Sequence, residues 1–358
     1  MVVDLEARIS IPALKKHLDE CTAKKIPVLG VVGIAGATEE SSVDDLASII
    51  ELKQSFSEKG LYFHFHIDGA YGGYFVCMTQ EKSLDHTNSY SEYVEKQLNS
   101  YKYADSITFD PHKTGYVPYT CGGLIYRNHR LRDNLNFTAP YVSSKNEPNM
   151  AIYGIEGSKP GSSVTSVYLS LQVLPLVRGG HGELLERTLM NSKIFTASLY
   201  RVKEIEVDYD YEQGKKLNER FECLLLPRLY SEKIGRPDLL EDEMEAIRKI
   251  SETGPRGLQA LVNSFENSCF NDTSSSTDSD KDECNHHKCK KNINFQDFYY
   301  NLGPDLNIVC YGLNFIDKAT GKFNTSLKKY NEFNRALIKL SKPMSTDTSV
   351  RTKDLYVS

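Results

Sequence analysis

Two charged residues follow short apolar segments of this chain, where parallel strands would end. Asp68 comes directly after Leu61–Ile67, and Lys113 comes shortly after Ser106–Phe109. A lysine shielded from water beside a histidine can lose its proton, and its amine can then form a Schiff base with an aldehyde. A shielded aspartate stays ionised only beside a positive partner, and a protonated pyridine nitrogen is such a partner. The two residues together predict a site for pyridoxal phosphate (PLP).

Each feature also has an ordinary structural explanation. Lysines are mostly exposed surface residues, and an aspartate at a strand end is most often a turn former. Thr38, which follows another apolar segment, has a hydroxyl that could bind a ligand oxygen or cap the next helix. Both interpretations stay open on the residues alone, although two such motifs in one chain favour a cofactor site.

The surrounding sequence predicts the elements that would position these residues. Ile26–Ile34 is rich in valine and indicates a buried parallel strand, and helical apolar spacing over Asp44–Phe56 indicates a helix after it. Strands over residues 61–67 and 106–109 follow, with an exposed helix over residues 89–102 between them. This alternation predicts an α/β fold with a mainly parallel sheet, which would bind ligands beyond the carboxyl ends of its strands.

A change of pattern near residue 200 predicts two domains. Residues 1–200 would form a large cofactor-binding domain, and residues 201–358 a small C-terminal α+β domain. Residues 268–291 are rich in Ser, Asp, Lys and Asn, and we expect a disordered insertion there. Cys284–Cys289 within it contains residue types that bind zinc, but their spacing fits no zinc family well. We therefore favour an incidental polar segment and expect no metal.

Composition limits the partners and the location that we expect. The chain has 358 residues, 25% of them charged, and a formal net charge of -5, which gives no general basic surface for nucleic acid. Its start lacks the pattern of a secretory signal, and it has no apolar run long enough to span a bilayer. The eight cysteines are scattered and fit reduced thiols. These features predict a cytoplasmic protein that binds neither nucleic acid nor membranes.

Longer motifs resemble one family of enzymes. His66–Gly73 (HIDGAYGG), Asp110–Lys113 (DPHK) and the glycine-threonine loop at Gly33–Glu40 are similar to the group II PLP-dependent amino-acid decarboxylases. Asp110–Tyr119 and Glu156–Gly161 most resemble the bacterial tyrosine-decarboxylase branch. The resemblance extends over most of the chain, and Asp-Pro-His-Lys is its most specific element.

The resemblance implies a type I PLP-transferase fold and the decarboxylation of an L-amino acid to its amine and CO2. It implies that Lys113 forms the Schiff base with PLP and that Asp68 pairs with the pyridine nitrogen. The other implied roles are Ala70 against one ring face, Thr38 beside the ring, His112 near the phosphate and imine, Tyr119 as the acid that protonates the α-carbon, and Gly157 and Ser158 near the phosphate of the neighbouring subunit's cofactor in a homodimer.

Tyrosine or another aromatic amino acid is the expected substrate, with glutamate or aspartate as the alternative. Members of this family are longer at the N-terminus, so we expect the dimerisation arm, the main phosphate loop and the ring-stacking histidine to be missing. The C-terminus, Asp354–Ser358, also resembles an interrupted strand. We therefore expect family membership without independent activity of this chain.

Two further alternatives stay open. One is a different PLP reaction on the same fold, such as that of a sphingosine-phosphate-type lyase or a cysteine-desulfurase-like enzyme. The other is an inactive chain that only associates with a full-length homologue.

Overall fold

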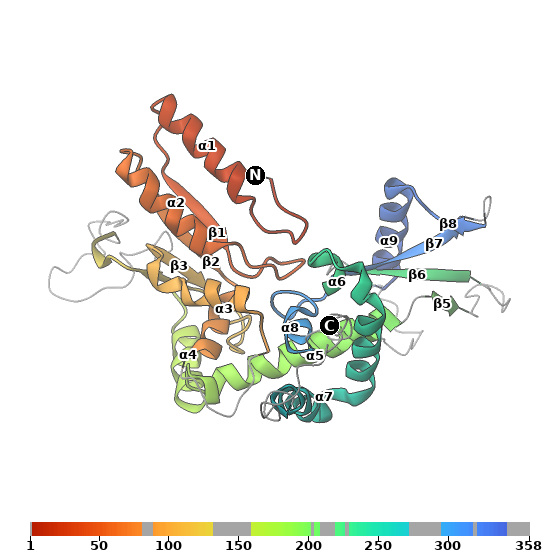
Figure 1. Cartoon of the computed structure of the whole chain (residues 1–358). Coiled ribbons are helices and arrows are strands. Elements are labelled where there is room, and N and C mark those ends of the chain that lie inside the picture. Colours follow the sequence, from red (N-terminus) through yellow and green to blue (C-terminus); the bar gives the residue numbers. More distant parts are fainter. Residues whose placement is uncertain are drawn as a thin grey trace, which may run out of the picture. The chain divides into compact units, whose positions relative to one another are not determined.

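A computed structural model describes residues 2–80, 89–131, 159–201, 204–207, 219–225, 229–271, 295–317 and 321–341. The chain divides into two compact units (Figure 1). The first comprises Met1–Arg201 with Leu226–Cys310, and the second Val202–Leu225 with Tyr311–Ser358. The domain boundary at residue 200 stays a prediction, and contacts group Leu226–Cys310 with the first unit rather than with the C-terminal part.

The first unit contains a four-stranded sheet in the order β1-β2-β3-β4. The strands are β1 (Gly30–Ile34), β2 (His64–Gly69), β3 (Ser106–Phe109) and β4 (Gly123–Tyr126). The β1–β2 and β2–β3 pairs are parallel, whereas β4 runs antiparallel to β3. The prediction of a mainly parallel sheet in an α/β fold is confirmed.

Helices pack on one face of this sheet. They are α1 (Ile11–Ala23), α2 (Leu46–Glu58) and α3 (Glu92–Asn99), and Figure 1 shows α1 and α2 beside β1 and β2. Side chains on this face are buried in one cluster that includes Phe65 and Ile67 of β2. Ser10, Asp45 and Ser91 cap the three helices by accepting a hydrogen bond from a backbone N–H of the first turn.

The other face of the sheet is more open. Alternate residues of β1 point to it, and Val32 is 51% and Ile34 41% exposed. His66 and Asp68 of β2 lie on the same face, because they pair in register with Val32 and Ile34. The strand alternation thus separates an apolar face under the helices from an accessible face that bears Asp68.

The later described residues of the first unit are largely helical. They form α4 (Gly161–Val173), α5 (Glu183–Arg201), α6 (Tyr230–Lys233), α7 (Leu240–Asn271) and α8 (Phe295–Asn301). Side chains of α5, α7 and α8 share a second buried cluster with Leu302. Helix α7 ends at Asn271 and so includes residues 268–271 of the predicted insertion, which stays a prediction. The remainder of the insertion, including Cys284–Cys289, lies outside the described residues.

The second unit contains an antiparallel sheet in the order β5-β6-β7-β8. Its elements are β5 (Glu204–Val207), β6 (Glu219–Leu225), β7 (Tyr311–Asp317), β8 (Lys322–Phe323) and α9 (Leu327–Ser341). Helix α9 packs on β7, with the rings of Phe315 and Phe333 5.0 Å apart. This sheet and its separate helix confirm the expected α+β composition of the C-terminal part.

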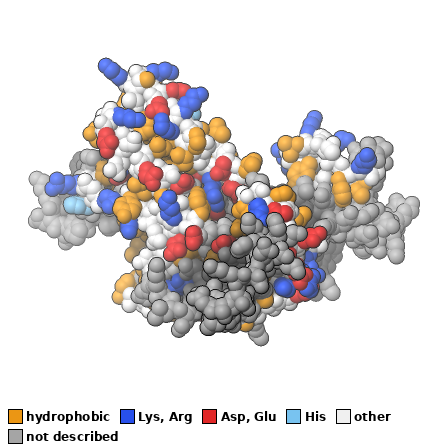
Figure 2. Space-filling model, in the orientation of Figure 1, with side chains coloured by type: hydrophobic (Ala, Val, Ile, Leu, Met, Phe, Trp, Pro, Cys, Tyr) orange, Lys and Arg blue, Asp and Glu red, His pale blue; other side chains and the backbone are white. Residues whose placement is uncertain are grey.

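Surface charge is mixed on the face shown in Figure 2, where Lys and Arg side chains alternate with Asp and Glu over the first unit. Within the described residues, none of the helices is both long and apolar enough to cross a membrane. The same residues contain no cluster of three or more His, Cys, Asp or Glu that could hold a metal ion.

Candidate cofactor site

The carboxyl ends of the three parallel strands meet at one edge of the sheet. Ile34 pairs with Asp68, Asp68 pairs with Thr108, and Gly69 pairs with Phe109. The segment that carries Lys113 leaves β3 at this edge, next to the turn that leaves β2. The sheet therefore brings the two predicted motifs to neighbouring strand ends, where α/β folds bind their ligands.

Glycines let the turn after Asp68 pack tightly between its neighbours. The Gly72 N–H donates a hydrogen bond to the Ala35 carbonyl at 2.9 Å, and a Cβ on Gly72 would lie 2.3 Å from that oxygen. A Cβ on Gly73 would lie 2.7 Å from Cβ of Phe109. The turn is thus held against the ends of β1 and β3, at positions where only glycine fits.

Asp68 is partly buried and accepts a hydrogen bond at Oδ1 from the Ala70 N–H at 3.1 Å. In the part of the chain that the structure describes, Asp68 forms no ion pair. Its carboxylate is therefore available to a positively charged nitrogen of a ligand. The Ala70 side chain, predicted to contact a ring, directly follows Gly69 in this turn.

Lys113 lies in the first turn after β3 and is anchored by Asp110. Its Nζ is 2.9 Å from Asp110 Oδ2, and His112 Nε2 is 3.7 Å from the same oxygen. The next residue, Thr114, is buried and donates a hydrogen bond to the Tyr71 carbonyl at 2.7 Å. This bond joins the Lys113 segment directly to the glycine turn that follows Asp68.

His112 and Tyr119 lie against each other, with ring centroids 4.2 Å apart. The Nδ1 atom of His112 contacts the backbone carbonyl of Cys121, and the Cys121 N–H lies 3.3 Å from the same nitrogen. Tyr119 is 76% exposed, so its hydroxyl is open to solvent in this chain. The structure thus brings His112 and Tyr119 together beside Lys113 in one loop.

The remaining predicted residues have different outcomes. Thr38 is exposed in the loop between β1 and α2, and the capping interpretation for it is wrong because Asp45 caps α2 by accepting from the Ser48 N–H at 3.1 Å. Gly157 and Ser158 lie outside the described residues.

Two residues that support the site were missed by the sequence analysis. Asp110 holds both His112 and Lys113, and its spacing three residues before the lysine was an available signal. His181 is fully buried, with Nε2 3.2 Å from the Gly115 carbonyl and Nδ1 2.8 Å from that of Leu174. No local pattern indicates His181, because its contact with the Lys113 segment depends on the tertiary fold.

The family model for the pyridoxal-dependent decarboxylase conserved domain matches residues 2–214, which include every element of this site. The chain belongs to this family. The prediction of family membership is therefore confirmed, and PLP is the cofactor of the family.

Several relatives of the chain are amino-acid decarboxylases by name. The chain is 36% identical to an L-tyrosine decarboxylase of Levilactobacillus brevis over 51% of its own length and 33% of the relative's. It is 34% identical to that of Enterococcus faecium over 54% and 35%. An aspartate 1-decarboxylase of Aliivibrio fischeri is 27% identical over 57% and 34%. The chain thus spans about a third of the length of these relatives.

Solved structures give partial matches. A glutamate decarboxylase of Lactobacillus brevis matches with a TM-score of 0.43 and 19% identity, over 62% of this chain and 44% of that one. A Catharanthus roseus tryptophan decarboxylase matches with a TM-score of 0.41 and 17% identity, over 67% and 45%.

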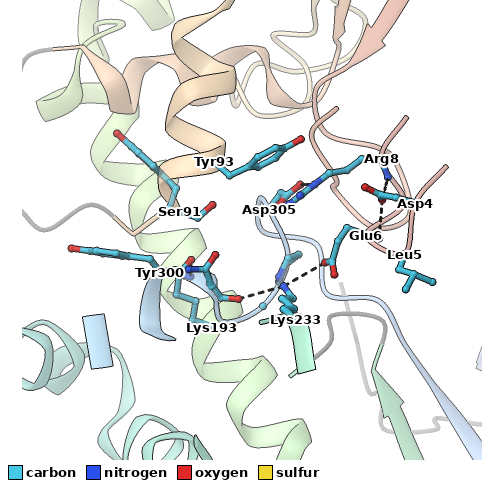
Figure 3. Close-up of a pocket in the computed structure, with 14 residues that line it drawn as sticks. Asp4, Leu5, Glu6, Arg8, Ser91, Tyr93, Lys193, Lys233, Tyr300 and Asp305 are labelled. Atoms are coloured by element: carbon cyan, nitrogen blue, oxygen red, sulfur yellow. Dashed lines mark hydrogen bonds and ion pairs between the residues drawn. The ribbon is translucent and has the colours of Figure 1, made fainter. Parts of the chain in front are cut away.

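A separate cavity of about 440 Å³ lies in the first unit, and none of the strand-end residues lines it (Figure 3). Arg8 donates to Asp305 at 2.9 Å, and Lys233 lies 3.4 Å from Glu6. The buried Lys193 donates to three backbone carbonyls at the end of α8, at 2.9 to 3.1 Å. Because these three cations have partners within the protein, we assign them a structural role.

Proposed function

We propose that this chain carries the Lys113–Asp68 part of a PLP site that decarboxylates an L-amino acid, with tyrosine or another aromatic amino acid as substrate. One observation carries the proposal: the lysine and the aspartate leave neighbouring parallel strands at one edge, and Thr114 and Tyr71 join their two turns. Tyrosine is favoured over aspartate because the tyrosine decarboxylases are 34–36% identical to this chain and the Aliivibrio aspartate enzyme 27%.

The donor groups at this edge fit PLP. Lys113 supplies an amine for its aldehyde, and Asp68 supplies a carboxylate without an ion-pair partner among the described residues for its pyridine nitrogen. The glycine turn packs against the ends of β1 and β3 and so holds Asp68 at the same edge as Lys113. When bound, PLP supplies an electron sink for the pair of electrons that remains when CO2 leaves.

The residues around Lys113 would handle its proton. Lys113 Nζ lies 2.9 Å from Asp110 Oδ2, and an ammonium group is not a nucleophile. Lys113 must therefore give up a proton before it can bind an aldehyde. Asp110 itself, and His112 at 3.7 Å from Asp110, are the groups placed to take it.

Roles for five other residues remain part of the proposal. Tyr119 would return a proton to the α-carbon, a role supported by its position against His112 beside Lys113. The residues expected to contact the cofactor are Ala70 and Thr38 in this subunit, and Gly157 and Ser158 toward a neighbouring one.

We further propose that the complete enzyme is a homodimer. The support comes from α4, which contains no buried residue although it carries several large apolar side chains. Val164 is 70%, Leu169 58% and Val173 85% exposed on this helix. Exposed apolar side chains of this size are typical of a surface that a second polypeptide covers. The same surface would also serve the alternative, an inactive chain that associates with a homologue.

A cytoplasmic location is also proposed. Cys21, Cys77, Cys121 and Cys310 are free thiols in the structure, as expected for a reducing compartment.

Borohydride trapping tests the proposal. The protein is incubated with limiting PLP and reduced, and the labelled peptide is identified by mass spectrometry. We expect the label on Lys113, its loss in Lys113→Ala, and no change in Lys102→Ala, which removes an exposed lysine before the start of β3. Label that persists in Lys113→Ala would overturn the assignment. Product analysis with tyrosine, aspartate and glutamate then identifies the substrate.

A further inference from the structure

A row of hydrogen-bonded side chains runs along the open face of the sheet and ends beside Asp68. Ser106 Oγ lies 2.7 Å from His64 Nε2 and 2.8 Å from His66 Nδ1. Thr108 Oγ1 lies 3.0 Å from His66 Nε2. The register pairs His66 with Ser106 and Asp68 with Thr108. The row therefore ends at the residue directly opposite Asp68.

The hydroxyl partners suit a neutral His66. A neutral imidazole has one nitrogen that donates and one that accepts, and a hydroxyl can do either. Ser106 and Thr108 therefore satisfy both ring nitrogens of His66 in either tautomer. Burial lowers the pKa of His66, an effect that Asp68 opposes and His64 reinforces.

The surroundings of His66 contain few other charges. On β2 the ionisable neighbours on its face are Asp68 and His64, one alternate position away in each direction, about 6.6 Å along a strand. On β1 it pairs with Val32, and on β3 its contacts are the two hydroxyls. Among the described residues, Asp68 is consequently the carboxylate that interacts most directly with a charge on His66.

On the basis of the proposed function, we propose that His66 is a positioning residue that keeps Asp68 available to the cofactor. The neutral ring of His66 fixes the Thr108 hydroxyl opposite Asp68. It also places no positive charge beside the carboxylate that would compete with the cofactor. A protonated His66 would attract Asp68 and compete with the pyridine nitrogen for it. A proton bound at His66 therefore weakens the binding of a cationic ring at Asp68, and a bound cationic ring weakens the binding of a proton at His66.

The first test requires no cofactor. In ¹⁵N-detected histidine titrations by NMR, replacing Asp68 by Asn should lower the titration midpoint of His66, because the carboxylate that favours its protonated form is gone. The midpoint of the remote His17, on α1, should stay unchanged. A His66 midpoint that does not respond to Asp68→Asn overturns the inference.

The second test measures the yield of PLP trapped on Lys113 as a function of pH. As His66 becomes protonated, the yield of trapped PLP in the wild type should fall about tenfold below that of His66→Gln. His66→Lys should show the low yield at every pH. His64→Gln removes a group that lowers the pKa of His66, so it should shift the fall in yield to higher pH without abolishing it. Identical profiles for wild type and His66→Gln would refute the role of His66. Absence of any Lys113 adduct in the wild type would instead refute the proposed function, and the NMR test would still decide the role of His66.

Discussion

At the scale of single residues, the site depends on bonds that join segments distant in sequence. Thr114 is buried next to Lys113 and donates to the Tyr71 carbonyl in the turn after Asp68. The bond fixes the lysine-bearing turn relative to the aspartate-bearing turn. Its removal should therefore affect both folding and cofactor capture.

Thr114→Val keeps the shape of the side chain and removes its hydroxyl. We expect a loss of about 1–3 kcal/mol in the free energy of unfolding, because the Tyr71 carbonyl would lose its partner in a buried position. Urea denaturation followed by circular dichroism measures it. Thr165→Val is the control, since the Thr165 hydroxyl bonds a carbonyl on the exposed α4. Equal effects of the two substitutions would contradict the special role of Thr114.

Lys193 gives a prediction for pH dependence. Burial, with Lys233 nearby, lowers the pKa of Lys193 to about 7, whereas an unfolded lysine keeps a pKa near 10.4. Between these values the unfolded chain binds more protons than the folded one, so this group makes stability rise with pH. The wild type should gain up to about 1.4 kcal/mol per pH unit relative to Lys193→Met above pH 7. Parallel stability curves for the two proteins would contradict the lowered pKa.

At the scale of elements, the strand ends and the glycine turn determine where the site forms. Gly72 lies where the turn after β2 crosses the end of β1, and any Cβ there would collide with the Ala35 carbonyl. The two nearest atoms are backbone atoms of Ala35, which cannot rotate away as a flexible side chain could. Only glycine fits at position 72, because the turn after β2 approaches the end of β1 so closely.

Gly72→Ala should lower the free energy of unfolding by about 1–3 kcal/mol, the usual effect of overpacking a tight site. Thermal denaturation measures the change. Gly161→Ala is the matched control, because a Cβ on Gly161, at the start of α4, would meet no atom within 4 Å. A Gly72→Ala protein as stable as the Gly161→Ala protein would show that the loops can separate.

The ends of the strands could be predicted well from the sequence, whereas the side-chain contacts between neighbouring strands could not. β-branched apolar segments that stop at glycine or aspartate indicated the ends of β1, β2 and β3, and hence the edge that carries Asp68 and Lys113. The row through His66 was not predicted, because its bonds depend on the register of β2 against β3. The start of α2 was also misjudged by two residues, since the capping residue Asp45 decides where this helix begins.

At the scale of the whole molecule, apolar surface remains exposed on α4 and on the open face of the sheet. β1 and β4 are the two edges of that sheet among the described strands, and a parallel edge strand with exposed Val32 and Ile34 can pair with another chain. Both features favour association with a further polypeptide.

Association through α4 can be tested by placing charge on its exposed apolar face. Leu169→Glu combined with Val173→Glu should reduce dimer formation by at least about tenfold and leave the melting temperature nearly unchanged, because neither side chain is buried in the unit. Sedimentation equilibrium gives the association constant. Ser162→Glu, an exposed polar position on the same helix, should have little effect. Undiminished association in the double variant would place the interface elsewhere.

The antiparallel strand β4 has one more consequence for Lys113. Phe109 and Gly123 pair across β3 and β4, so the segment between them is a loop whose two ends are joined by the sheet. Formation of the sheet closes this loop, and the entropy lost in closing it belongs to folding rather than to ligand binding. A ligand that reaches Lys113 therefore meets a lysine whose backbone is already ordered, and β4, which carries none of the proposed site residues, is the strand that preorganises it.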